Sequence, residues 1–142
     1  KAQVHAVGVR ESPEYFYQHA LATVEELGLS TDHVGPIKDL LHIYDGQGLG
    51  YTRSTDEELA YIIEVAQTTG IILDPVYCGK GLYHFANKVL QDDTKKAAFL
   101  PGQKVLFIHT GGTVGLYDKE SEVVKLLPKD KVSRMKQYPV VK

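Results

Sequence analysis

Three side chains able to take part in catalysis or ligand binding follow apolar runs of this sequence. Tyr77 and Cys78 come shortly after the apolar run 71–73, and Thr110 comes directly after a second run, 104–109. Both runs have the composition of short buried strands. In open α/β sheets, ligands bind outside the carboxyl ends of the strands. We therefore expect the three side chains to lie at one site.

Glycine accompanies each of these positions. Gly79 follows Cys78, while Gly111 and Gly112 follow Thr110. Glycine lets a planar ligand approach the backbone closely, but it also suits an ordinary turn. The sequence leaves both interpretations open at Gly111 and Gly112.

Cys78 is the only cysteine, which excludes an internal disulfide and a cysteine-based zinc site. A reducing compartment, cytoplasm or organellar matrix, is therefore expected. Cys78 could act as a nucleophile with His109 as its base, but a small buried hydrophobic residue is the favoured interpretation. No two histidines have the i, i+4 spacing of a helical metal pair, and no metal is expected.

A glycine-rich loop, Gly46-x-Gly48-x-Gly50, lies between a predicted strand and a predicted helix. Its spacing differs from the Gly-x-Gly-x-x-Gly of dinucleotide-binding folds, and the helix opens too late. A nucleotide-binding module is therefore the least favoured alternative. The better interpretation is a close-approach loop that carries Tyr51 toward a ligand.

The composition is that of an ordinary globular protein and excludes several classes of function. The 142 residues carry a formal net charge of −2, with 43% hydrophobic and 24% charged residues. This balance indicates neither nucleic acid nor an anionic membrane as a partner. No apolar run approaches the roughly 20 residues that a membrane-spanning helix needs.

The predicted elements alternate between strands and helices. Ser12 and Pro13 predict the start of the first helix, and Thr55 with Glu58 forms a capping box that starts the second. The predicted strands are 4–9, 40–44, 71–73 and 104–109, and the predicted helices are 13–27, 56–69 and 79–90. This order predicts an α/β fold, a three-layer, mostly parallel sheet with helices on both faces.

Residues 118–142 differ in character from 1–117. Positive and negative side chains are mixed there, and Pro128 and Pro139 interrupt the segment. We expect a single domain over 1–117 and a solvated surface extension over 118–142, rather than a binding tail.

Two motifs resemble those of a known enzyme family. The first is Asp74-Pro75-Val76-Tyr77-x-Gly79-Lys80, and the second runs from Lys104 through Thr110-Gly111-Gly112 to Gly115-Leu116-Tyr117. Together they closely resemble D-cysteine desulfhydrases and 1-aminocyclopropane-1-carboxylate (ACC) deaminases, pyridoxal phosphate (PLP) enzymes with a tryptophan-synthase-β-like fold. The resemblance extends over 4–117 and matches only the carboxy-terminal portion of such enzymes.

The resemblance implies roles for individual residues. Tyr77 and Tyr51 match catalytic tyrosines on the substrate side. Thr110 matches the position that meets the pyridine nitrogen of PLP, with Cys78 beside it, and Gly111 and Gly112 complete the cofactor-binding set.

Two of these positions separate the activities within the family. Deaminases carry Glu where this chain has Cys78 and Leu where it has Thr110. A carboxylate keeps the pyridine nitrogen protonated, and a hydroxyl or thiol does so far less. The resemblance therefore favours α,β-elimination of D-cysteine to pyruvate, ammonia and sulfide, with ACC deamination as the alternative.

One part of the family's machinery has no counterpart in this sequence. The lysine that forms the Schiff base with PLP lies in the amino-terminal part of such enzymes, and Lys80 matches a different position. We therefore expect these 142 residues alone to be inactive and another segment or second chain to carry that lysine, in an enzyme that resembles dimeric relatives. The other possibility is a truncated, inactive homologue that acts as a binding or assembly subunit.

Overall fold

The computed structural model describes residues 3–99 and 101–128. Its sheet consists, within these residues, of two parallel strands, β1 (Val4–Gly8) and β2 (Leu41–Asp45). Val4 pairs with Leu41 and Gly8 with Asp45. Both strands were predicted from the sequence, to within one residue at each end.

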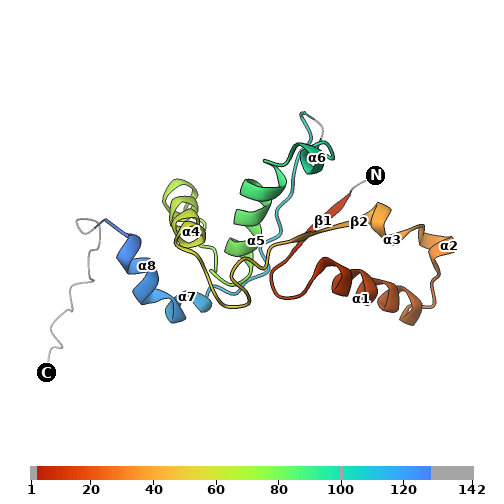
Figure 1. The fold of residues 1–142 in the computed structure, drawn as a ribbon, viewed down its shortest axis with the longest axis horizontal. Helices are drawn as coiled ribbons and strands as arrows, with labels where there is room; N and C mark the ends of the chain where they lie inside the picture. Colours follow the sequence, from red (N-terminus) through yellow and green to blue (C-terminus); the bar gives the residue numbers. More distant parts are fainter. Residues whose placement is uncertain (1–2, 100, 129–142) are drawn as a thin grey trace, which may run out of the picture.

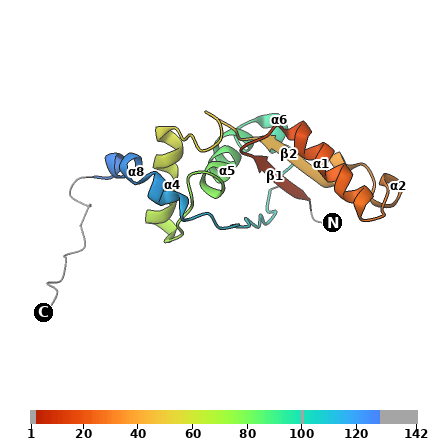
Figure 2. The same ribbon diagram turned by 90° about the horizontal axis from the view of Figure 1, so that it is seen from below.

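The connection between the two strands is helical, as a parallel pair requires. It contains α1 (Pro13–Glu26) and two single turns, α2 (Thr31–Val34) and α3 (Ile37–Leu40). The turns lie in the segment predicted as a loop. Figure 2 shows α1 running alongside the strand pair.

The helix starts that the sequence predicted are confirmed. The Ser12 hydroxyl accepts a hydrogen bond from the amide of Tyr15 at the start of α1. Before α4 (Asp56–Thr69), Thr55 and Glu58 form both bonds of a capping box, at 3.2 and 2.9 Å. Gly70 ends α4 in the left-handed conformation, with φ of +75°.

The core lies where α4 meets α5 (Cys78–His84). Its buried residues are Leu59, Ile62, Leu73 and Cys78. A π-helical turn, η1 (Phe85–Val89), continues α5, so the helix predicted over 79–90 is confirmed in extent. α6 (Asp93–Lys96) is a short turn beyond it.

The end of the described chain is helical rather than a simple extension. After α7 (Gly115–Asp118), α8 (Glu120–Leu126) packs against α4, with Val123 and Leu126 against the core. The helix was not predicted because its apolar face has only two or three side chains among mixed charges. The rest of the predicted extension, 129–142, lies outside the described residues.

Two predicted strands, 71–73 and 104–109, are not strands within the part of the chain that the structure describes. A strand requires a neighbour to complete its ladder of hydrogen bonds, and neither segment has one here. Most of the side chains stay exposed, with Leu106 at 85% and Ile108 at 70%. The three-layer sheet expected from the sequence is accordingly reduced to a two-stranded sheet with helices beside it.

The described elements are arranged in an elongated way. The strands with α1 to α3 lie toward one end, α5 lies between, and α4 and α8 lie toward the other end (Figure 1). None of the helices within 3–99 and 101–128 is long and apolar enough to cross a membrane.

Candidate active site

The turn that delivers Tyr77 and Cys78 is built on the carboxylate of Asp74. Its Oδ1 accepts from the amides of Val76 and Tyr77 at 2.9 and 2.6 Å, and its Oδ2 accepts from the amide of Cys78 at 2.8 Å. Asp74 is fully buried. Since charged acceptors form the strongest such bonds, Asp74 fixes the backbone at both predicted site residues.

Tyr51 and Tyr77, the two tyrosines that the resemblance assigns to the substrate side, lie together. Their hydroxyl groups form a short hydrogen bond, although the residues are 26 positions apart. Both side chains are partly exposed, at 40% and 46%. Arg10 lies over the Tyr51 ring, 5.1 Å from its centroid. The pair therefore presents two hydroxyl groups at an open surface with a cation beside it.

Cys78 and Thr110 form a second pair. The Cys78 sulfur lies 3.4 Å from both the hydroxyl oxygen and the amide nitrogen of Thr110, and 3.6 Å from the carbonyl oxygen of Gly111. Cys78 is buried, whereas Thr110 is exposed. The Thr110 hydroxyl is thus the accessible member of a neutral pair.

The two glycines after Thr110 differ in their surroundings. A Cβ atom on Gly112 would come within 3.0 Å of the Asp74 carboxyl carbon, and its φ is +87°. Gly111, with φ of +103°, has open space where a side chain would lie. The backbone is therefore held against Asp74 on one side and open beside Thr110 on the other.

His109 has partners that make it a poor base for Cys78. Its Nδ1 accepts from the amide of Gly111 at 3.0 Å, so its Nε2 carries the proton and donates to the carbonyl of Ile72, also at 3.0 Å. The Cys78 sulfur is 3.9 Å from Nδ1. These contacts favour a structural His109 and argue against a nucleophilic Cys-His pair.

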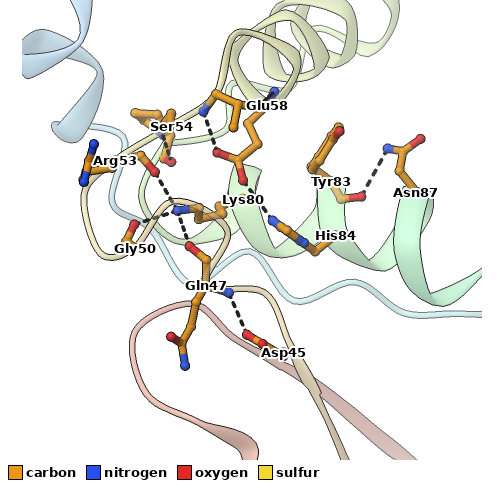
Figure 3. Close-up of polar contacts among 12 residues, drawn as sticks. Asp45, Gln47, Gly50, Arg53, Ser54, Glu58, Lys80, Tyr83, His84 and Asn87 are labelled. Carbon is orange, nitrogen blue, oxygen red and sulfur yellow. Dashed lines mark hydrogen bonds and ion pairs between the residues drawn. The ribbon is translucent and has the colours of Figure 1, made fainter.

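The glycine loop 46–54 directs several of its backbone groups into the protein. The amides of Gly46, Gln47, Gly50 and Arg53 are all bonded within the protein. The carbonyls of Gln47, Gly50 and Arg53 instead converge on the ammonium group of Lys80 (Figure 3). Phosphate sites need free amides, so these four bonded amides disfavour the nucleotide-binding alternative.

Comparison with known proteins relates this geometry to a named group of enzymes. No family model matches the chain. It is 40% identical, over 89% of its length, to the mitochondrial bifunctional D-cysteine desulfhydrase/ACC deaminase of Arabidopsis thaliana. A solved structure of an ACC deaminase homologue superposes on 87% of the chain with a TM-score of 0.62 and 29% identity. The chain is thus similar, over most of its own length, to a part of the D-cysteine desulfhydrases and ACC deaminases.

The match covers only part of these relatives. The chain spans 30% of the Arabidopsis protein and 35% of the solved structure. A putative ACC deaminase of Pyrococcus furiosus is 36% identical over 73% of the chain and 30% of its own length. A Klebsiella pneumoniae D-cysteine desulfhydrase is 35% identical over 48% of the chain.

Sequence reasoning missed the residues that support the candidate site. Asp74 was interpreted only as the end of a strand, although an aspartate before proline is a known start of turns. The buried pair of Glu58 and His84, 2.9 Å apart, had no local signal beyond the capping box (Figure 3). No local sequence signal indicated that Lys80 is buried, because the burial of a lysine depends on distant parts of the chain.

The electrostatics of the candidate site follow from these contacts. The hydrogen bond with Tyr51, which stabilises the protonated form of Tyr77, raises the pKa of the Tyr77 hydroxyl above its ordinary value of 10.0. Burial lowers the pKa of Lys80, and the nearby carboxylate of Glu58 partly opposes that effect. Within the described residues, no three His, Cys, Asp or Glu side chains gather as a metal site.

Proposed function

We propose that this chain supplies part of the active site of a PLP-dependent lyase of the D-cysteine desulfhydrase type. Such an enzyme converts D-cysteine and water into pyruvate, ammonia and sulfide. The observation that carries the proposal is the neutral pair of Cys78 and Thr110 on the same structural unit as the Tyr51–Tyr77 pair.

The residues present suit PLP. Thr110 offers an exposed hydroxyl for the pyridine nitrogen, and the open backbone at Gly111 leaves room for a planar ring. When bound, PLP supplies an electron sink for the charge that develops at the substrate Cα. A hydroxyl and a thiol are neutral neighbours, which suits elimination of a good leaving group more than opening of a cyclopropane ring.

The tyrosine pair suits proton transfer at the substrate. Tyr77 holds a proton at its hydroxyl oxygen, and its raised pKa keeps that proton in place at neutral pH. We assign Tyr77 as the donor to the departing sulfur of the substrate. Tyr51 orients the Tyr77 hydroxyl through their shared hydrogen bond.

ACC deamination is the second candidate, because the Arabidopsis relative is named for both activities. The carboxylate that lies closest in sequence to Cys78 is that of Asp74. This carboxylate is fully buried and accepts hydrogen bonds from three backbone amides. It is therefore not available to the cofactor. This arrangement ranks ACC behind D-cysteine as a substrate.

The complete site requires residues beyond this chain. Lys80 is buried and holds three carbonyls, so we place the PLP-binding lysine in another segment and expect the 142 residues alone to be inactive. The exposed apolar side chains at 71–72 and 105–108 support a larger sheet that other residues complete, which would restore the three-layer arrangement. We also propose a reducing compartment and a dimeric enzyme.

Assay of the complete protein that contains this chain tests the proposal. Pyruvate and sulfide should form from D-cysteine with a kcat/KM above that for ammonia release from ACC. Borohydride reduction and mass analysis should find PLP on a lysine other than Lys80. A kcat/KM that favours ACC would overturn the desulfhydrase assignment, and the absence of any PLP adduct would favour a binding subunit.

A further inference from the structure

We propose that Lys80 is a positioning residue for Tyr51: its ammonium group holds loop 46–54 so that the Tyr51 hydroxyl meets that of Tyr77. This inference rests on the proposed function, since Tyr77 is the proton donor there. It assigns a specific task to a buried lysine that does not itself contact the tyrosine pair.

The ammonium group of Lys80 is completely used by the loop. Its Nζ donates to the carbonyls of Gln47 and Gly50, both at 2.8 Å, and of Arg53 at 2.6 Å (Figure 3). An ammonium group has three donors, so each has its own acceptor. Lys80 is 1% exposed, and few lysines are buried to that extent without a specific partner.

Two of the Lys80 hydrogen bonds lie on either side of a residue with a strained backbone. Thr52 has φ of +61°, a left-handed conformation that a β-branched residue rarely adopts. Two of the carbonyls that Lys80 binds, those of Gly50 and Arg53, lie on either side of Tyr51 and Thr52. Such strain persists only where the surrounding structure holds it, and the Lys80 bonds hold the backbone on both sides of Thr52.

Lys80 also connects the loop to the other tyrosine. It lies three residues after Tyr77, at the start of the same helix, where the amide of Gly81 donates to the Tyr77 carbonyl at 2.8 Å. The Asp74 carboxylate fixes the Tyr77 amide from the other side. The short segment 77–80 therefore contains Tyr77 and, through Lys80, binds the loop that contains Tyr51.

A buried carboxylate partly compensates the charge of Lys80. Glu58 interacts with it electrostatically, and Glu58 is itself held by the Thr55 amide and by His84. Figure 3 shows the Glu58, His84 and Lys80 side chains gathered beside the loop residues that Lys80 binds. Glu58 thus partly offsets the cost of burying the Lys80 charge, and all three donors of the ammonium group are bonded to the loop.

A double-mutant cycle in the complete enzyme tests the inference. Lys80→Met keeps the length of the side chain and removes the ammonium, and Lys88→Met, on the exposed side of η1, is the matched control. We expect Lys80→Met to lower kcat by about 10²-fold with a smaller change in KM, because a misplaced proton donor slows chemistry more than binding. Lys88→Met should leave both unchanged.

The decisive comparison uses the Tyr51→Phe background. Because Lys80 acts through Tyr51, adding Lys80→Met to Tyr51→Phe should lower kcat further by less than about threefold. If the fall in kcat of the double variant equals the product of the falls in the two single variants, the inference is overturned.

A second measurement does not depend on activity. Hydrogen exchange of the Gly50 and Arg53 amides, both bonded within the loop, should become at least about tenfold faster in Lys80→Met and stay unchanged in Lys88→Met. Unchanged exchange would overturn the inference even if turnover falls.

If Lys80→Met does not fold, Gly50→Ala strains the loop from its open side at φ of +108° and should reproduce the kcat loss and the faster exchange at Arg53. A wild-type enzyme inactive on D-cysteine and ACC would remove the proposed function, while the exchange result would still decide whether Lys80 orders the loop.

Discussion

The Cys78 sulfur lies 3.4 Å from the Thr110 hydroxyl oxygen, although 32 positions separate the two residues. Only Thr110 is exposed, so a ligand at this surface meets a hydroxyl backed by a thiol. A neutral pair of this kind sets the electronic character of the proposed cofactor site, because neither group carries the full negative charge that would keep a ring nitrogen protonated.

Thr110→Val removes the hydroxyl with little change of volume. In the complete enzyme, we expect a shifted PLP absorbance band and weaker cofactor retention, because the ring nitrogen loses its partner. Absorbance spectra and dialysis against buffer measure both. Thr113→Val, at a nearby exposed threonine, is the control. A spectrum identical to that of the wild type would mean that Thr110 does not meet the ring.

Tyr77→Phe should lower kcat for D-cysteine by about 10²- to 10⁴-fold, the usual contribution of a positioned acid or base. Tyr117→Phe, at an 80% exposed tyrosine, should have no effect. Steady-state kinetics on the complete enzyme provide the comparison, and an unchanged kcat would remove Tyr77 from the catalytic residues.

Tyr51→Phe should change the pH dependence of turnover. The hydrogen bond with Tyr51 stabilises the protonated form of Tyr77 and raises its pKa, so the loss of this bond lowers that pKa toward 10.0. Because Tyr77 must carry its proton to act as a donor, the alkaline decline of kcat should move to lower pH. A decline that stays in place would show that another group controls it.

Asp74→Ala should destabilise the protein by about 3 kcal/mol, because three amides lose their acceptor and unsatisfied buried donors are costly. Asp74→Asn keeps an acceptor oxygen and should lose roughly half as much. Urea unfolding of the complete protein measures both, with Asp118→Ala at an exposed position as the control. Equal losses for the two Asp74 variants would contradict this account of the turn.

His5 should make stability depend on pH. Burial and the neighbouring His42 lower its pKa below the ordinary value of 6.5. The unfolded chain therefore binds more protons in the window below 6.5, so stability is fully present above that pH and is lost as the pH falls toward the pKa of folded His5.

Urea unfolding at pH 7.5 and pH 5 tests this effect. His5→Asn should reduce the difference between the two free energies of unfolding, because the residue that titrates is gone. His19→Asn, at an exposed histidine, should leave the difference unchanged. A wild-type difference that persists in His5→Asn would assign the effect to another group.

Local signals predicted the local structure correctly. The capping box of Thr55 and Glu58, the Ser12 cap and the stop at Gly70 were all found where the sequence placed them. Each depends on side chains that bond to the backbone within three or four residues. The parallel pair of β1 and β2 was also predicted, because both have strand composition and a helix of sufficient length connects them.

The segments 71–73 and 104–109 show where local signals fail. Their composition favours strands, yet a strand forms only beside another strand, and the partner is not encoded in the segment itself. Likewise, the few apolar residues of α8 gave no sign that Val123 and Leu126 would pack against the core.

The sequence by itself determined the residue types of the candidate site, since its motifs place Tyr77, Cys78 and Thr110 beside glycine and after apolar runs. Tertiary structure alone decided which of these residues meet. The Tyr51–Tyr77 and Cys78–Thr110 pairs join residues 26 and 32 positions apart. The buried charge of Lys80 gains its three carbonyls only when loop 46–54 folds over α5. The physical reason is that hydrogen-bond partners and burial are properties of the whole packed chain, whereas caps and turns are properties of a few consecutive residues.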